Sequence, residues 1–187
     1  MDEIEVGFSK LMDKIKDQEQ KTAELSDEIR KHDAMLLGRM AVSAMPVVRK
    51  AGLNLLERGK QDPKGELYDT GFYADKVIVL GKTDPVKYRP DDPGKQVMDQ
   101  FCVLGENGTF SELMYSSDGY VVDSYRQPLQ PADALRIYGY DVMFMVYRAM
   151  KDYLEGAEEL VESLGKVLEF VFDKTVPPKE EKKQKAG

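Results

Sequence analysis

The sequence predicts an α+β protein, and three observations lead to this prediction. The first 36 residues repeat apolar side chains every three or four positions, as an amphipathic helix does. Asn107-Gly108 and Asp118-Gly119 separate short apolar runs, which is a strong local signal for β-hairpins. From Met143 a second long stripe returns to the helical period. We therefore expect an N-terminal coiled-coil-type helix, a small antiparallel β meander of three to four strands, and a long C-terminal amphipathic helix packed on the sheet.

The first predicted helix covers residues 2–36 and carries a narrow apolar stripe. Polar residues fill three of its heptad slots, at Gln18, Thr22 and His32, and Leu36 closes it. We call the other six positions the heptad seam: Ile4, Phe8, Leu11, Ile15, Leu25 and Ile29. A stripe this narrow needs another helix to cover it, so the sequence predicts that the seam is an oligomer interface.

The partner of this seam has two alternatives. In a parallel homodimer the flanking residues would meet in four pairs: Gly7–Met12, Lys14–Glu19, Lys21–Ser26 and Glu28–Asp33. One pair attracts, one repels and two have no charge interaction, so the charges do not specify this dimer. The other alternative is the final helix of the same chain, because residues 4–36 and 143–172 would span roughly 48 and 44 Å as helices.

The order of helix, hairpins and helix resembles the layout of prefoldin subunits. The resemblance is one of layout and implies paired helices that present apolar surface at their tips, as in a chaperone. We keep this prefoldin-like layout as a second alternative for the function.

The remaining segments divide the chain into a linker, a domain and a tail. Residues 37–60 are predicted to be a helical linker, with a second helix from Ser43 to about Arg58 that holds Pro46 in its first turn. Residues 61–176 are predicted to form the α+β domain. Strands are expected at residues 72–80, 96–104, 110–116 and 120–125, before a final helix that begins near Pro131 and ends at Pro177. Residues 177–187 are expected to be a disordered charged tail.

Composition disfavours several classes of function. The net charge is −7, and residues 61–130 carry 12 acidic and 7 basic residues, which disfavours binding to a phosphate backbone. Cys102 is the only cysteine, so no intrachain disulfide forms, and a small core residue is expected there. Neither a signal peptide nor an apolar run of membrane-spanning length is present, so we expect a cytoplasmic protein without a membrane partner. The sequence contains no metal or cofactor motif, and we expect neither group.

Catalytic residues are few, and an enzyme is therefore the less favoured reading. His32 is the only histidine and occupies a core slot of the first helix, where a polar residue can set the register of pairing. The alternative function is an enzyme or small-molecule sensor with a pocket between the sheet and the C-terminal helix. Glu112 and Asp123, near Tyr115 and Tyr125, would do its acid–base work.

One surface loop is a candidate site for a protein partner. Residues 82–95 contain three prolines and exceed the usual length of a connection between strands. Their cations surround one aromatic ring and form what we call the cationic cluster: Lys82, Lys87, Tyr88, Arg89 and Lys95. The cluster would suit an acidic peptide or an anion. Together these observations predict a non-enzymatic interaction protein, either a homo-oligomeric adaptor or a subunit of a larger cytoplasmic assembly.

Overall fold

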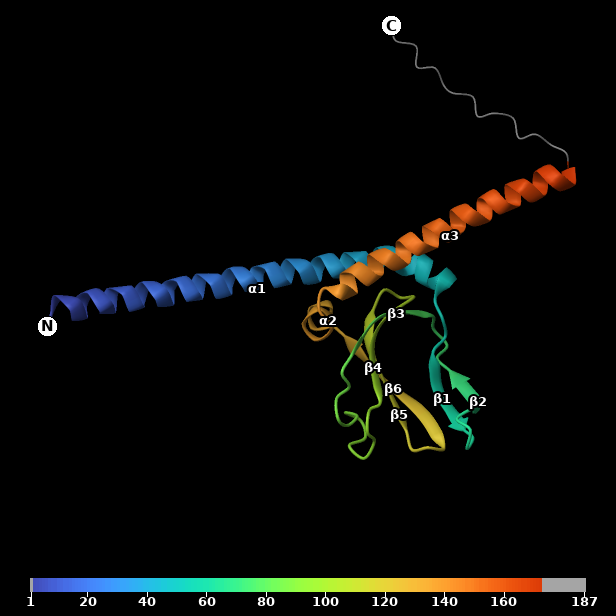
Figure 1. Ribbon diagram of the computed structural model, residues 1–187, viewed down its shortest axis with the longest axis horizontal. Helices are drawn as coiled ribbons and strands as arrows, with labels where there is room; N and C mark the ends of the chain where they lie inside the picture. The colour runs from blue at the N-terminus through green and yellow to red at the C-terminus, as the bar shows by residue number, and fades with distance from the viewer. Residues whose placement is uncertain (1, 173–187) are drawn as a thin grey trace, which may run out of the picture. The chain divides into compact units, whose positions relative to one another are not determined.

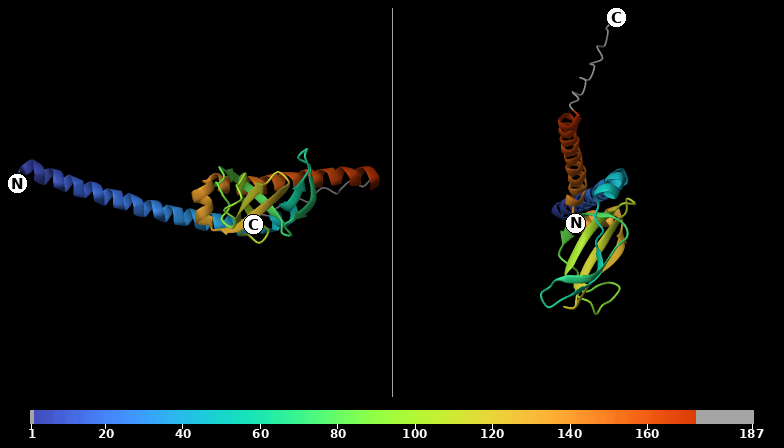
Figure 2. Two further views of the ribbon diagram at one scale, coloured as in Figure 1. Left: turned by 90° about the horizontal axis from the view of Figure 1, so that it is seen from below. Right: turned by 90° about the vertical axis from the view of Figure 1, so that its right-hand side faces the viewer.

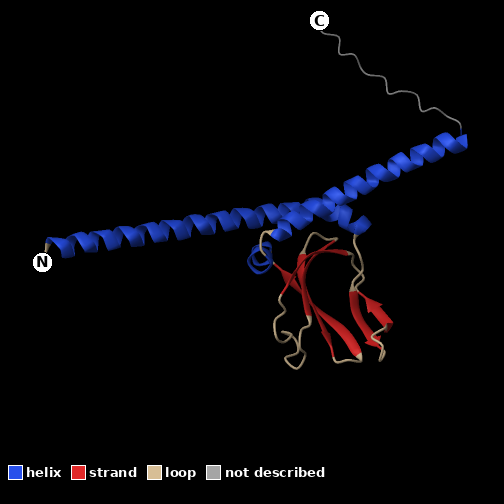
Figure 3. Ribbon diagram, in the orientation of Figure 1, coloured by secondary structure: helices blue, strands red, loops and turns tan. Residues whose placement is uncertain are grey.

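The computed structural model describes residues 2–172 of the 187-residue chain and shows an α+β protein (Figures 1 and 3). The elements in chain order are α1 (Glu3–Ala51), β1 (Leu56–Gln61), β2 (Leu67–Phe72), β3 (Val77–Thr83), β4 (Asp99–Gly105), β5 (Phe110–Ser117), β6 (Val121–Leu129), α2 (Pro131–Tyr138) and α3 (Asp141–Phe172). The chain divides after Arg148 into two compact units. The long N-terminal helix and the antiparallel sheet confirm the predicted fold class.

The six strands form one antiparallel sheet in the order β2-β1-β6-β5-β4-β3. An isolated bridge between Leu53 and Val77 joins the segment before β1 to the first residue of β3, so the sheet curls toward closure. Strands β3 to β6 correspond to the four predicted strands. The predicted count of three to four is wrong, because the sheet also contains β1 and β2.

The two unpredicted strands lie at one edge of the sheet and bury little. All six residues of β2 are exposed, and β1 buries only Gly59. A strand that buries neither face has no need for alternating apolar residues, so it gives no period of two in the sequence. The turn between them did leave a signal, since Pro63 precedes Gly65, whose φ is +87°. Asp62 Oδ1 accepts the backbone N–H of Lys64 and of Glu66 in this turn.

The two predicted hairpin turns are confirmed. Gly108 and Gly119 have φ of +77° and +90°, in the left-handed region that glycine adopts without strain. Asn107 Oδ1 accepts the backbone N–H and the hydroxyl of Thr109 in the first turn. In the second turn Asp118 Oδ1 accepts the backbone N–H groups of Tyr120 and Val121. These turns fix the register of β4, β5 and β6.

Helix α1 runs through Pro46 to Ala51, so the predicted second helix from Ser43 to Arg58 is wrong. A proline inside a helix removes one hydrogen bond and costs about 3 kcal/mol. The side chains of Leu37, Ala41, Ala44 and Val48 are fully buried around this position. Burying side chains of this size contributes roughly 1–3 kcal/mol each, and the sum over the four side chains exceeds the cost of the proline. The domain boundaries themselves stay predictions.

The C-terminal helical region consists of two helices, because Gly139 ends α2 with a φ of +75°. In α3 only Val142 and Val146 are buried, both in its first two turns. Beyond Arg148 the large apolar side chains of α3 are exposed within their own unit, and the packing of this helix on the sheet stays a prediction. The predicted helix end at Pro177 and the predicted tail lie outside the described residues.

The central strands of the larger unit are buried on both faces, and one buried cluster lies on the face that carries Val103. Val77, Val103 and Leu113 form its buried centre. Four partly buried side chains pack against this centre: Leu55, Tyr73, Phe101 and Tyr115. The space between these groups has no room for a water molecule. Figures 1 and 2 show α1 crossing one end of the sheet, where its buried residues contribute to the same unit.

Candidate functional site

The heptad seam is exposed to solvent in the single chain. The exposed fraction of its six side chains ranges from 40% for Ile15 to 77% for Ile4. Figures 1 and 2 show the sheet near the C-terminal end of α1, and no strand lies beside the N-terminal half of the helix. Within the unit that ends at Arg148, the seam is therefore left without a cover.

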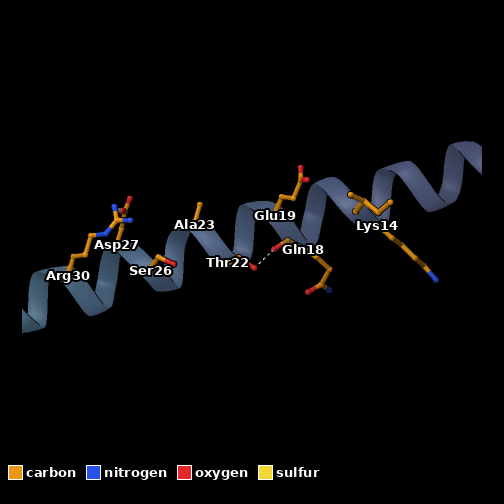
Figure 4. Close-up of a pocket in the computed structure, with 9 residues that line it drawn as sticks. Lys14, Gln18, Glu19, Thr22, Ala23, Ser26, Asp27 and Arg30 are labelled. Atoms are coloured by element: carbon orange, nitrogen blue, oxygen red, sulfur yellow. Dashed lines mark hydrogen bonds and ion pairs between the residues drawn. The ribbon is translucent and has the colours of Figure 1, made fainter. Parts of the chain in front are cut away.

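The middle of the seam is polar and slightly hollowed (Figure 4). Only α1 contributes to the hollow, whose lining residues are Lys14, Ile15, Gln18, Glu19, Thr22, Ala23, Ser26, Asp27 and Arg30. The Thr22 hydroxyl donates a hydrogen bond of 2.8 Å to the carbonyl oxygen of Gln18. Because its donor is satisfied within the helix, Thr22 can enter an interface without losing a hydrogen bond.

Local contacts alone stabilise the N-terminal half of α1 only weakly. Gln20 donates to Glu24 at 2.9 Å, and Arg30 forms an ion pair with Asp27 at 3.3 Å. Such pairs contribute about 0.2–0.5 kcal/mol each. Long helices in proteins owe most of their stability to the packing of an apolar face. This half of α1 therefore has the sequence of a helix that packs on a surface outside its own unit.

The unit that begins at Ala149 carries a second exposed apolar stripe. Its large exposed side chains on α3 are Leu154, Leu160, Val161, Leu164, Val167, Leu168, Phe170, Val171 and Phe172. Residues 149–172 contain six acidic and two basic side chains. Ion pairs within the helix join Lys151 to Glu155 and Lys166 to Glu162. This stripe is wider than the heptad seam.

The structure divides the cationic cluster into separate contacts. Lys82 belongs to β3 and forms an ion pair of 2.6 Å with Asp99, and its Nζ lies 5.7 Å from the centre of the Phe101 ring. Lys87 lies over the ring of Tyr88, with its Nζ 5.1 Å from the ring centre. Lys82, Lys87 and Tyr88 are the exposed part of the cluster.

Arg89 and Lys95 converge on Asp123, a carboxylate of β6. Arg89 is only 6% exposed, and its Nη1 lies 3.0 Å from Asp123 Oδ1. Lys95 pairs with the other oxygen of Asp123. Arg89 also donates two hydrogen bonds to Asp91, which lower the pKa of that carboxyl. The guanidinium of Arg89 covers the Tyr125 ring at 5.6 Å. Arg89 therefore holds the loop on the sheet, a role that the sequence reading missed although Asp91 is its near neighbour.

Glu112, a carboxylate of the alternative reading, is buried in a network of neutral donors. It is 4% exposed and accepts hydrogen bonds from Gln100, Gln127 and Tyr138, at 2.6, 2.7 and 3.0 Å. Burial, followed by the charge of Glu112, raises the pKa of the Tyr138 hydroxyl. Burial likewise raises the pKa of the Cys102 thiol, which lies opposite Glu112 in the sheet, to about 12. These contacts tie α2 to the sheet and keep Cys102 protonated.

The groups of the alternative reading do not gather around one cavity. Tyr115 pairs with Ser124 in the sheet, whereas Glu112 pairs with Gln127 and lies on the opposite face. Asp123 borders an open hollow of about 260 Å³ beside the β5–β6 turn, and its oxygens are taken by cations. His32 is exposed on α1. Among residues 2–172 no group of three or more His, Cys, Asp or Glu side chains is placed to hold a metal ion.

Comparisons with protein families, with curated proteins and with solved structures find no match for this chain. The likeness to prefoldin subunits therefore stays one of element order. Within the described residues, no helix combines the length and the apolar character that crossing a membrane requires.

Proposed function

We propose that the chain is a homo-oligomeric interaction protein whose heptad seam binds the seam of a second copy. The observation that carries the proposal is the exposure of six regularly spaced apolar side chains on one stripe of α1. Isolated exposed apolar residues are common on protein surfaces, but a stripe over about seven turns of helix is typical of an interface. An adaptor, or a subunit of a larger assembly, would use such an interface to bring copies of its sheet together.

The expected strength of this association follows from the exposure of the seam. Full burial of an apolar side chain contributes roughly 1.5–3 kcal/mol, and about half of that remains available where half of the side chain is exposed. Twelve seam residues in a dimer then contribute about 9–18 kcal/mol before the cost of association, which is about 4–15 kcal/mol. The difference is compatible with the ~8 kcal/mol of a micromolar complex.

Polar residues in the seam do not oppose this association. Thr22 is already satisfied within its helix. A glutamine at a core position, such as Gln18, can bond to the same residue of a partner, because its amide group both donates and accepts. A polar core layer weakens pairing but restricts it to registers in which polar groups meet. Gln18 and His32 would thus select a register.

Light scattering of the whole chain beside a version that starts at Asp33 tests the proposal. We expect the mass of the whole chain to rise with concentration and the shortened chain to stay below it. Pairing of the seam with the final helix of the same chain would give a monomer at all concentrations, and loss of residues 1–32 would then lower its stability. Two monomers of equal stability would contradict both forms of pairing.

A further inference from the structure

We infer that the two copies of α1 lie parallel and in register, and that the assembly formed by the seam has two strands. The inference rests on the proposed self-association and adds direction and number to it. Both quantities follow from the side-chain shapes inside the seam, and the flanking charges supply the test of direction.

The core positions of the seam separate β-branched from γ-branched side chains. In a heptad labelled a to g, Ile15, Thr22 and Ile29 take the a positions. Leu11 and Leu25 take the d positions. β-Branched residues at a with leucine at d favour parallel pairs, because the two positions pack with different angles in that arrangement. Isoleucine at both positions, or leucine at a with isoleucine at d, favours three or four strands instead.

The layers at the two ends of the stripe do not follow this pattern. Phe8 takes an a position and Ile4 a d position near the N-terminus, and Leu36 takes an a position at the other end. Four layers, at residues 11, 15, 25 and 29, therefore determine the assignment. They lie on both sides of the polar layers at Gln18 and Thr22, so the pattern is not confined to one end of the helix.

The end of the seam is accessible although α1 packs on its own sheet. The buried residue Val48 and the seam residue Ile29 are nineteen positions apart, which places them about 100° apart around the helix axis. Tyr140, between α2 and α3, donates a hydrogen bond of 2.7 Å to Asp33, on the side of α1 that faces its own unit. Contacts within this unit thus reach Asp33 beside the seam but leave the apolar side chain of Ile29 exposed.

Parallel pairing has a consequence for function. Each α1 carries its sheet at the C-terminal end, so two parallel copies place their sheets at the same end of the pair. Two identical surfaces held close together can engage a repeated or dimeric partner with an avidity that exceeds either single contact. Antiparallel pairing would instead separate the two sheets by the length of the seam.

The charge at Glu28 discriminates between the two directions. In the parallel pair Glu28 meets Asp33 of the second copy, so Glu28→Lys turns repulsion into attraction at two symmetric places. We expect the dissociation constant of the dimer to fall about fivefold or more. In an antiparallel pair, flank g meets flank g, where the possible neighbours of Glu28 include Lys14 and Lys21. The same change would then weaken the dimer. Glu24→Lys, on the outward face of α1, is the matched control and should leave the dissociation constant unchanged relative to the original chain.

A cysteine at position 11 reports the direction independently. In the parallel register Leu11→Cys faces its own counterpart, and mild oxidation with oxidised glutathione should link the two chains by a disulfide. In an antiparallel pair with Thr22 against Gln18, the two cysteines would lie about 27 Å apart along the axis and would not react. Cys102 is fully buried, so the original chain is the blank for this experiment.

The outcomes separate the inference from the proposed function. A dimer that is tighter with Glu28→Lys and cross-linked through position 11 supports both. A dimer that is weaker with Glu28→Lys and not cross-linked overturns the parallel arrangement but leaves self-association intact. A trimer or larger species overturns the two-stranded assignment alone. A whole chain that stays monomeric overturns the proposed function, and the inference falls with it.

Discussion

Replacing Leu25 by serine removes one apolar side chain from the middle of the heptad seam. Leu25 is 61% exposed in the single chain, so a partner can still bury about that share of its surface. Relative to the roughly 1.5–3 kcal/mol of a fully buried leucine, this leaves about 1–2 kcal/mol per side chain, and each dimer contains two. We expect dimerisation to become less favourable by about 2–4 kcal/mol, which raises the dissociation constant about 30- to 700-fold.

Val42→Ser is the matched control for this substitution. Val42 lies on the same helix and is 62% exposed, but its position is about 100° away from Leu25 around the axis. Neither side chain is well buried in the single chain, so both changes should leave the unfolding free energy of the monomer within about 0.5 kcal/mol. Sedimentation velocity over a range of concentrations measures the association, and urea unfolding measures the stability.

Two results would refute the reasoning. Equal association of both variants and the original chain would show that the seam is not the interface. A large loss of stability in a monomeric Leu25→Ser chain, with no such loss for Val42→Ser, would show that Leu25 is covered within its own chain.

Three further predictions concern the sheet and the loop that packs on it. Arg89→Ala removes one cationic partner of the mostly buried Asp123, so the free energy of unfolding measured in urea should fall by about 3 kcal/mol. The exposed control Lys87→Ala should change this free energy by less than about 0.5 kcal/mol, and an equally small effect of Arg89→Ala would contradict the structural role of Arg89. The raised pKa of Cys102, about 12, keeps its thiol protonated at pH 8, so iodoacetamide should label the chain only after unfolding. Hydrogen bonds from Arg89 lower the pKa of Asp91 in the folded protein. The ionised Asp91 therefore stabilises the fold fully above the ordinary aspartate pKa, and this contribution is lost as the pH falls through the lower pKa of the folded state. Asp91→Asn should reduce this acid-dependent loss of stability in urea titrations, and an unchanged pH profile would count against the contact.

The sequence could predict those elements whose local chemistry and burial agree. The Asn107-Gly108 and Asp118-Gly119 turns have residue pairs that suit their backbone, and β4 and β5 beside them are mostly buried. β1 and β2 could not be found from periodicity, because neither strand buries a face. The continuation of α1 through Pro46 depends on tertiary burial of Leu37, Ala41 and their neighbours, which a local rule for proline does not contain.

The candidate sites were predictable to different degrees. A heptad stripe is a property of one helix, so the sequence alone located the seam and the structure adds only its exposure. The cationic cluster depended on residues far apart in the chain. Asp123, on a strand 28 or more positions along the chain, forms ion pairs with Arg89 and Lys95, and Asp99, on a neighbouring strand, forms an ion pair with Lys82. Counting charges within one loop could not reveal partners on another strand.

Sedimentation equilibrium of the whole chain, from about 1 to 200 µM, tests the central claim most directly. We expect the mass to rise from 21.2 kDa at the lowest concentrations to twice that value at the highest, with a midpoint in the micromolar range. A mass of 21.2 kDa throughout this range would contradict it.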